Sequence, residues 1–247
     1  MLYHFVSMDS NCKYYCYKNN KKLKDRDINK PDKVKLVFFD MDGVLADTIS
    51  SWKKIHDYFG TSNDKSIDDY LKGKINDLEF IERDVSLWKK TGNVTTKYTI
   101  EDILFDTPVM NGAKEFINYL KKNDIKTAII SAGLDILANK LAEELGIDYV
   151  YANGVKEDAE GILTGEGILK VELTGKDKNV KKLAKKLNIE PKDCAAIGNS
   201  CFDIPMFNNS GLAIAFNPED QCVRKSADII VEGKNLKNII PKIKPYI

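Results

Sequence analysis

The stretch VKLVFFDMDGVLADT, residues 34–48, contains the transition that decides the fold. An apolar run ends abruptly at Asp40, and further acids follow at Asp42 and Asp47. A short apolar run that is rich in Val and Phe and ends in a turn is typical of a buried β-strand. Carboxylates this close repel one another unless a cation is present or one of them holds a proton. The stretch therefore predicts a buried strand that opens into a charged loop.

Beyond residue 107 the chain alternates between strand and helix patterns. Further strands are expected at residues 125–130, 194–197, 212–216 and 228–231. Residues 149–171 carry four glycines and predict a short strand followed by a hairpin. Strands that alternate with helices predict a Rossmann-like α/β core with a doubly wound parallel sheet. In such sheets the ligand lies beyond the carboxyl ends of the strands.

Residues 49–106 show only helical patterns. The apolar residues of 52–59 share one helix face and those of 78–88 share another, and a capping arrangement predicts a helix start at Thr99. We therefore expect a small helical cap, inserted after the first strand. The expected division is a core of residues 31–48 and 107–247, a cap of residues 49–106, and a solvated N-terminal extension of residues 1–30.

Composition excludes several classes of protein. The 247 residues are 43% hydrophobic and 30% charged with a net charge of +1, which favours a globular chain and neither a nucleic-acid nor a membrane partner. We expect no transmembrane helix and no signal peptide. Five scattered cysteines suit a reduced cytoplasm. Only Arg26, Arg83 and Arg224 are arginines, so phosphate binding would depend on lysine and backbone amides.

Polar residues follow several of the predicted strands. Asp40 ends the first strand, Ser131 follows a later one, and Gly198 opens a polar turn that reaches Asp203. The carboxyl ends of parallel strands meet at one edge of the sheet, so these residues are expected to form one pocket. Carboxylates, a hydroxyl and a nearby lysine suit a phosphate group and a hard divalent cation, because Mg²⁺ prefers oxygen ligands.

Three stretches resemble the haloacid dehalogenase superfamily, and within it the phosphoserine phosphatase group. FFDMDGVLAD resembles the signature Asp-x-Asp-x-(Thr/Val), and AAIGNSCFDIPMF resembles the acidic metal motif Gly-Asp-x-x-x-Asp. IISAGLDILANKLAEELGIDYVYAN resembles the stretch around the phosphate-binding serine. The resemblance covers residues 33–240. One Asp-x-Asp pair is weak evidence, whereas several motifs in the right order are strong evidence.

The resemblance implies a Mg²⁺-dependent phosphatase that acts on a small phosphorylated metabolite through an aspartyl-phosphate. Asp40 would be the nucleophile and Asp42 the proton donor and acceptor. The implied phosphate-binding residues are Gly43, Ser131, Ala132 and Lys176. The implied metal-binding residues are Asp40, Asp42 through its carbonyl oxygen, Asn199, and Asp203 through a metal-bound water.

Each of these residues also has an ordinary structural interpretation. Asp40 and Asp42 could form a turn that caps a helix, Ser131 could be a helix N-cap, and Lys176 could be a surface lysine. The motif lysine itself has two candidates. A gapless count from the last motif favours Lys176, whereas Lys178 requires a two-residue deletion.

Asn199 is the first departure from the family pattern, because the family usually has an aspartate there. A neutral amide removes one negative charge from the metal site and predicts weaker Mg²⁺ binding. This leaves open a phosphate-binding module with weak or no turnover. A sugar phosphomutase is a second alternative, because DMDGVLADT also resembles the opening of that class.

The cap is the second departure. Aligned on the phosphoserine phosphatase cap, Asp84 replaces the arginine that binds the substrate carboxylate, and Ile49 replaces the acid that meets the substrate amine. An aspartate repels a carboxylate. We therefore expect a phosphomonoester without an α-carboxylate. No acid or nucleophile is expected to act as a partner of His56, so a structural role is expected for it.

Overall fold

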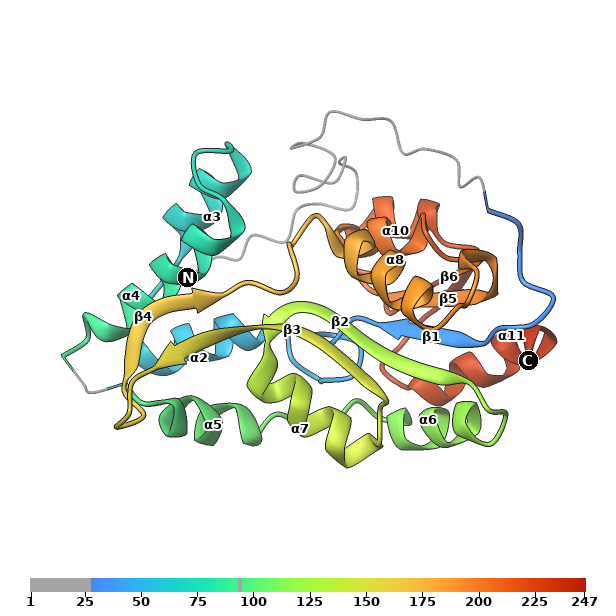
Figure 1. Cartoon of the computed structure of the whole chain (residues 1–247), viewed down its shortest axis with the longest axis horizontal. Coiled ribbons are helices and arrows are strands. Elements are labelled where there is room, and N and C mark those ends of the chain that lie inside the picture. The colour runs from blue at the N-terminus through green and yellow to red at the C-terminus, as the bar shows by residue number, and fades with distance from the viewer. Residues whose placement is uncertain (1–27, 93–94) are drawn as a thin grey trace.

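The computed structural model describes residues 28–92 and 95–247, and its centre is a seven-stranded sheet (Figure 1). The strand order is β4-β3-β2-β1-β5-β6-β7. The strands are β1 Leu36–Phe39, β2 Lys126–Leu134, β3 Tyr149–Glu157, β4 Leu163–Ile168, β5 Cys194–Gly198, β6 Leu212–Phe216 and β7 Ile229–Val231. Neighbouring strands are parallel except β3 and β4, which form the predicted hairpin. The predicted α/β fold is confirmed. Most of the predicted N-terminal extension lies outside the described residues.

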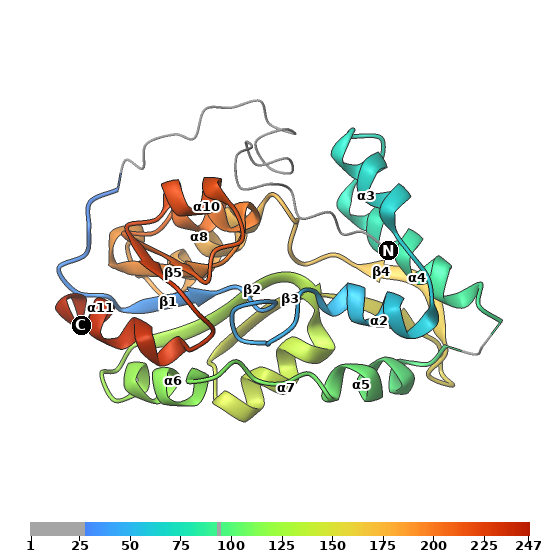
Figure 2. The same ribbon diagram turned by 180° about the vertical axis from the view of Figure 1, so that it is seen from behind.

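Helices cover both faces of the sheet, as the two opposite views show (Figures 1 and 2). The longer ones are α2 Ser51–Phe59, α3 Asp64–Leu71, α4 Asp77–Lys89, α5 Lys97–Phe105, α6 Ala113–Lys121, α7 Asp135–Leu145 and α8 Lys176–Lys186. Shorter ones are α9 Ile204–Phe207, α10 Gln221–Ser226, α11 Ile240–Ile243 and the 3₁₀ turns η1 Pro191–Asp193, η2 Cys201–Asp203, η3 Leu236–Ile239 and η4 Lys244–Tyr246. Helices α6, α7 and α11 lie on one face, and α8 and α10 lie on the other.

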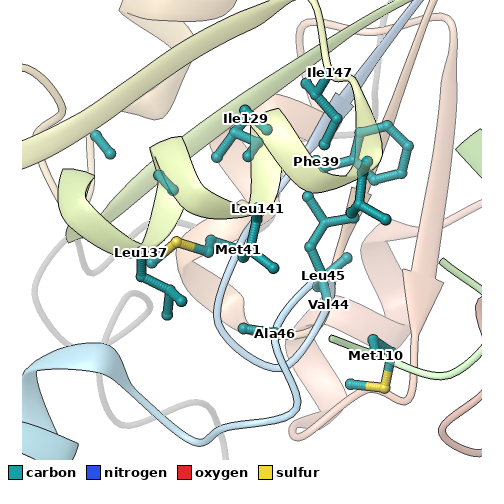
Figure 3. Close-up of a cluster of buried hydrophobic side chains, with 14 of the residues drawn as sticks. Phe39, Met41, Val44, Leu45, Ala46, Met110, Ile129, Leu137, Leu141 and Ile147 are labelled. Carbon is teal, nitrogen blue, oxygen red and sulfur yellow. The ribbon is translucent and has the colours of Figure 1, made fainter. Parts of the chain in front are cut away.

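Strand β1 is buried on both faces, which explains its continuous apolar sequence. Val37 and Phe39 pack into the larger hydrophobic cluster, whereas Leu36 and Phe38 pack into a separate one. Figure 3 shows Phe39 in the larger cluster with Ile129 and Leu141, next to the loop that follows β1. The loop that carries Asp40 is therefore fixed at its base by packing on both sides of the sheet.

The four helices α2–α5 lie between β1 and β2 in the chain, where the sequence predicts the cap. Helix α5 begins earlier than predicted: Thr96 is its N-cap and accepts a hydrogen bond from the Thr99 amide, so a helix start at Thr99 is wrong. The hairpin belongs beside these helices, because β4 packs on α4. Their approach is so close that a side chain on Gly167 would lie 2.6 Å from Ile81.

Candidate active site

Lys176 lies at the centre of the candidate site. Its Nζ is 2.8 Å from Asp40 Oδ1 and 2.7 Å from Asp203 Oδ1, and its side chain is only 3% exposed. Asp40 follows β1, Asp203 closes the turn after β5, and Lys176 is the first residue of α8. Three segments that are far apart in the sequence are therefore joined by one buried cation, as the parallel sheet predicts.

Lys178 is in a different environment. It is exposed and pairs with Glu172 at 2.6 Å. Burial alone would lower the pKa of Lys176, but the charges of Asp203 and Asp40 raise it, so this lysine stays protonated. Of the two lysines considered from the sequence, Lys176 is the one that contacts Asp40.

Asp42 is held by Ser51, the first residue of α2. Ser51 donates both its backbone N–H and its hydroxyl to Asp42 Oδ2, each at 3.0 Å. The Ser51 hydroxyl oxygen also accepts a hydrogen bond from the Leu134 amide. The other oxygen, Asp42 Oδ1, is buried and has no hydrogen-bond partner among the described residues. Ser51 therefore ties the start of α2 to the acidic loop, a contact that the sequence analysis did not identify.

The environment of Asp42 suits a group that carries a proton near neutrality. Burial raises its pKa to about 7, assisted by the charge of Asp40, although the two hydrogen bonds from Ser51 act in the opposite direction. Burial and the charge of Asp40 also raise the pKa of Asp203, against the influence of Lys176. A general acid is most effective when its pKa lies near the working pH.

Close backbone approach explains two glycines of the site. Gly43 has a φ of +74°, and a Cβ there would lie 2.2 Å from Asn199 Nδ2. A Cβ on Gly133 would lie 2.8 Å from Asp42 Oδ2. Larger residues would push apart the loop after β1, the end of β2 and the loop after β5, so these glycines allow the three segments to meet.

Ser131 and Ala132 lie in an irregular part of β2. The register with β3 shifts between Ile130 and Leu134, so β2 extends past Ser131 instead of ending there as predicted. The Ser131 hydroxyl oxygen accepts a hydrogen bond from Gly133 N–H, and the Ala132 carbonyl accepts one from the Trp52 indole at 3.0 Å. An N-cap role for Ser131 is not observed, because Leu134 is the N-cap of α7.

Asn199 is buried and makes three hydrogen bonds with Asp203 and Glu219. Its backbone N–H donates to Asp203 Oδ2 at 2.9 Å, and its carbonyl accepts from Glu219 N–H at 2.8 Å. Its side-chain amide donates to Glu219 Oε1 at 3.0 Å. Glu219 was missed by sequence analysis, because it lies in the loop after β6 and outside the three quoted motifs.

The donor chemistry of this centre fits a divalent cation. Asp40 and Asp203 contact the buried Lys176, Asp42 lies in the same loop as Asp40, and Glu219 contacts Asn199. Asn199 and backbone carbonyls add neutral oxygens. Within the described residues no three Asp, Glu, His or Cys side chains converge as a ready metal cluster. Both Asp203 oxygens already accept hydrogen bonds from the protein. A cation would therefore take its ligands from Asp40, Asn199, main-chain oxygen, substrate and water, with Asp203 supporting them indirectly.

A cavity of about 320 Å³ lies between the cap helices and these loops. Its apolar wall includes Ile49, Trp52, Ile67, Tyr70, Phe80 and Phe202. Its charged residues are Asp77, Asp84, Glu219 and Lys53, and Lys53 is ion-paired with Asp57. The lining therefore contains three carboxylates and one cation that already has a partner.

Asp84 is a buried part of this wall. Its Oδ2 accepts a hydrogen bond from Asn63 at 2.8 Å and lies 3.3 Å from His56 Nε2, while its Oδ1 has no hydrogen-bond partner among the described residues. The Trp88 indole, which can only donate, contacts His56 Nδ1, so the ring proton faces Asp84. His56 does have an acid partner, so the prediction that it has none is wrong, but the pair lies within the cap.

Comparison with known proteins identifies the family. The family model described as haloacid dehalogenase-like hydrolase matches residues 34–211. The chain belongs to this family. It is 34% identical over 216 residues to the phosphoserine phosphatase of Methanocaldococcus jannaschii, covering 86% of this chain and 99% of that one. It is 31% identical to the phosphoserine phosphatase of Campylobacter jejuni subsp. doylei, covering 85% and 100%.

Solved structures agree with this assignment. A phospho-aspartyl intermediate analogue of phosphoserine phosphatase superposes with a TM-score of 0.71 at 30% identity, over 85% of this chain and 99% of that one. A substrate-bound phosphoserine phosphatase complex gives a TM-score of 0.71 at 29% identity, over 85% and 98%. This haloacid dehalogenase-like hydrolase is therefore a phosphoric monoester hydrolase of the phosphoserine phosphatase-like kind. In its described part, no helix combines the length and the apolar character that a membrane span requires.

Proposed function

We propose that the protein hydrolyses a small phosphomonoester in two steps through an aspartyl-phosphate on Asp40. The observation that supports this most directly is the buried contact of Lys176 with both Asp40 and Asp203, next to the Asp42–Ser51 pair. The position of each group suits one role, and the solved phospho-aspartyl analogue of a relative has the same fold.

In the first step a carboxylate oxygen of Asp40 forms a bond to phosphorus while the bond from phosphorus to the leaving oxygen breaks. Asp42 gives its proton to that oxygen. In the second step a water attacks phosphorus, gives its proton to Asp42, and releases inorganic phosphate and the Asp40 carboxylate. Ser51 keeps Asp42 in place throughout both steps.

Lys176, the Ser131 hydroxyl and the amides at Gly43 and Ala132 are proposed to hold the phosphoryl oxygens. Asp40, the Asp42 carbonyl and Asn199 would hold a Mg²⁺ ion, supported by Asp203. Mg²⁺ would neutralise charge on the phosphoryl group and fix its orientation. The helices α2–α5 would act as a cap that excludes bulk water.

The wall of the cavity favours a substrate whose leaving group carries no carboxylate. Asp77, Asp84 and Glu219 would repel one, and Lys53 is already paired with Asp57. The Asp84 oxygen without a partner suits a hydrogen-bond donor, such as a hydroxyl or an ammonium group. Phosphoserine is the competing candidate, because relatives carry that name.

Release of phosphate from p-nitrophenyl phosphate with Mg²⁺ or with a chelator tests this function. We expect Mg²⁺-dependent turnover that falls at least about a thousand-fold in Asp40→Asn, because no nucleophile remains. Turnover that survives this substitution would contradict the covalent route. If the wild type shows no turnover and Asn199→Asp creates it, the protein is a phosphate-binding module. The comparisons favour hydrolysis over the phosphomutase alternative.

A substrate panel tests the leaving group. We expect phosphoethanolamine and neutral alkyl phosphates to have higher kcat/KM values than phosphoserine. Phosphoserine as the clearly best substrate would contradict the proposal for the cavity wall.

A further inference from the structure

The pairing of Asn199 with Glu219 carries an inference beyond the family pattern. The two residues exchange two hydrogen bonds, one from the Asn199 amide to Glu219 Oε1 and one from the Glu219 backbone N–H to the Asn199 carbonyl. Asn199 is buried, whereas Glu219 is exposed and lines the cavity. The loops after β5 and β6 are therefore locked together at the position where a cation would bind.

The first consequence concerns which end of the amide faces the cation site. An asparagine side chain can be turned over with almost no change in shape, and only its oxygen can bind a metal. Glu219 Oε1 accepts a hydrogen bond from the NH₂ group of Asn199, so this contact leaves Asn199 Oδ1 for another partner. A glutamine in place of Glu219 could bond to either end and would lose this selection.

The second consequence concerns charge. Asn199 is neutral, and Glu219 places a carboxylate oxygen 3.0 Å from its amide nitrogen. Burial and the charges of Asp203 and Asp40 raise the pKa of Glu219 to about 7 in the metal-free protein. When Glu219 is ionised, the pair carries the single negative charge that an aspartate would supply at the metal. Carboxylates that orient and polarise a ligand in this way typically change metal affinity by about 10- to 100-fold.

We propose that Glu219 is a positioning residue that makes Asn199 an effective Mg²⁺ ligand. The proposal rests on the proposed phosphatase function, because it concerns the same site. It predicts that an acid is needed at one of the two positions, and that the two positions compensate for each other.

Isothermal titration of metal-free protein with Mg²⁺ tests this without relying on turnover. We expect Glu219→Gln to weaken Mg²⁺ binding by about tenfold or more. Glu190→Gln is the matched control. This glutamate is exposed, and among the described residues its only ion pair is with Lys192. It precedes β5, so it lies at the end of the strands opposite the site. Glu190→Gln removes the same charge and should bind Mg²⁺ like the wild type.

The exchange variant is decisive. Asn199→Asp combined with Glu219→Gln should restore Mg²⁺ binding to at least the wild-type affinity. Asn199→Asp alone places two carboxylates side by side, so its metal-free form should melt at a lower temperature than the wild type and gain more from added Mg²⁺. The two substitutions should therefore be strongly non-additive.

Several results would overturn the proposal. Glu219→Gln could bind Mg²⁺ as tightly as Glu190→Gln, the exchange variant could bind as weakly as Glu219→Gln alone, or Glu219→Gln could raise KM for substrate with an unchanged Mg²⁺ affinity. In these cases the wild type still binds Mg²⁺ and turns over, so the proposed function stands. If the wild type does neither, both proposals fail together.

Discussion

In the core, Lys176 joins two buried acids, whereas in the cap the buried Asp84 contacts Asn63 and His56. Both Asp203 oxygens accept hydrogen bonds, but Asp84 Oδ1 has no such partner. A buried network in which every polar atom has a hydrogen-bond partner is costly to alter. Such a network suits a chemical step that is the same for every substrate. A carboxylate oxygen without a hydrogen-bond partner, such as Asp84 Oδ1, suits discrimination among substrates. The comparison suggests that the core determines the reaction and the cap determines the substrate.

The largest effect is expected from Lys176→Met. Removing this cation leaves Asp40 and Asp203 buried and unpaired, which should cost about 3–5 kcal/mol of unfolding free energy. Activity should fall at least about a thousand-fold, because Lys176 is also proposed to hold the phosphoryl group. Urea unfolding and phosphate release measure the two effects.

Lys178→Met is the matched control for this variant. Its exposed pair with Glu172 contributes less than about 1 kcal/mol, so stability and activity should stay near those of the wild type. If Lys178→Met lost the activity and Lys176→Met kept it, the structural choice between the two lysines would be wrong.

The next largest effect is expected from Asp42→Asn. Loss of the proton donor should slow hydrolysis of alkyl phosphates by about 10²- to 10⁴-fold. Formation of the intermediate from p-nitrophenyl phosphate should suffer less, because nitrophenolate leaves without a proton. Rapid-quench kinetics with both substrates compares the two. Asp47→Asn is the control in the same loop, since Asp47 pairs with the exposed Lys234 at 2.6 Å. Equal losses for both substrates would argue against Asp42 as the proton donor.

Asp84→Asn probes the cap side of the comparison. Asparagine can still accept the hydrogen bond from Asn63 and remain in contact with His56, so the cap should stay folded. The ratio of kcat/KM for phosphoethanolamine to that for a neutral alkyl phosphate should fall by about tenfold, since one charged contact is lost. Hydrolysis of p-nitrophenyl phosphate should change little. An unchanged ratio would remove Asp84 from substrate recognition.

The smallest effect concerns pH and stability. Burial raises the pKa of Asp84 above its ordinary value of 3.8, so the folded protein resists ionising this group. The resulting loss of unfolding free energy is absent well below pH 4. It grows as the pH rises from about 4 to the raised pKa. The stability of Asp84→Asn relative to the wild type should therefore increase between pH 4 and pH 8 in urea unfolding. A relative stability that falls over this range would contradict the assigned environment.

Local sequence predicted most of the core. The continuous apolar run of β1 follows from burial on both faces, and Gly60 and Gly146 end α2 and α7 in the left-handed conformation that the stop signals imply. The start of α5 was misplaced, because Thr96 and Thr99 are both acceptable caps and the structure uses Thr96. Which of two nearby residues becomes the N-cap depends on tertiary packing.

The site residues outside the motifs could not be predicted in this way. Ser51 lies nine residues beyond Asp42, and Glu219 lies twenty residues beyond Asn199, and each meets its partner only when two loops converge. The acid partner of His56 is a residue of another helix, Asp84. Spacing along the chain contains no signal for these contacts.

Trapping the aspartyl-phosphate tests the central claim most directly. Asp42→Asn should form the intermediate from p-nitrophenyl phosphate yet hydrolyse it slowly, so the covalent species should accumulate. Acid quenching followed by peptide mass spectrometry should find one phosphoryl group on Asp40, and none in the variant that also carries Asp40→Asn. Turnover without a phosphorylated peptide, or a phosphoryl group on another residue, would contradict the account.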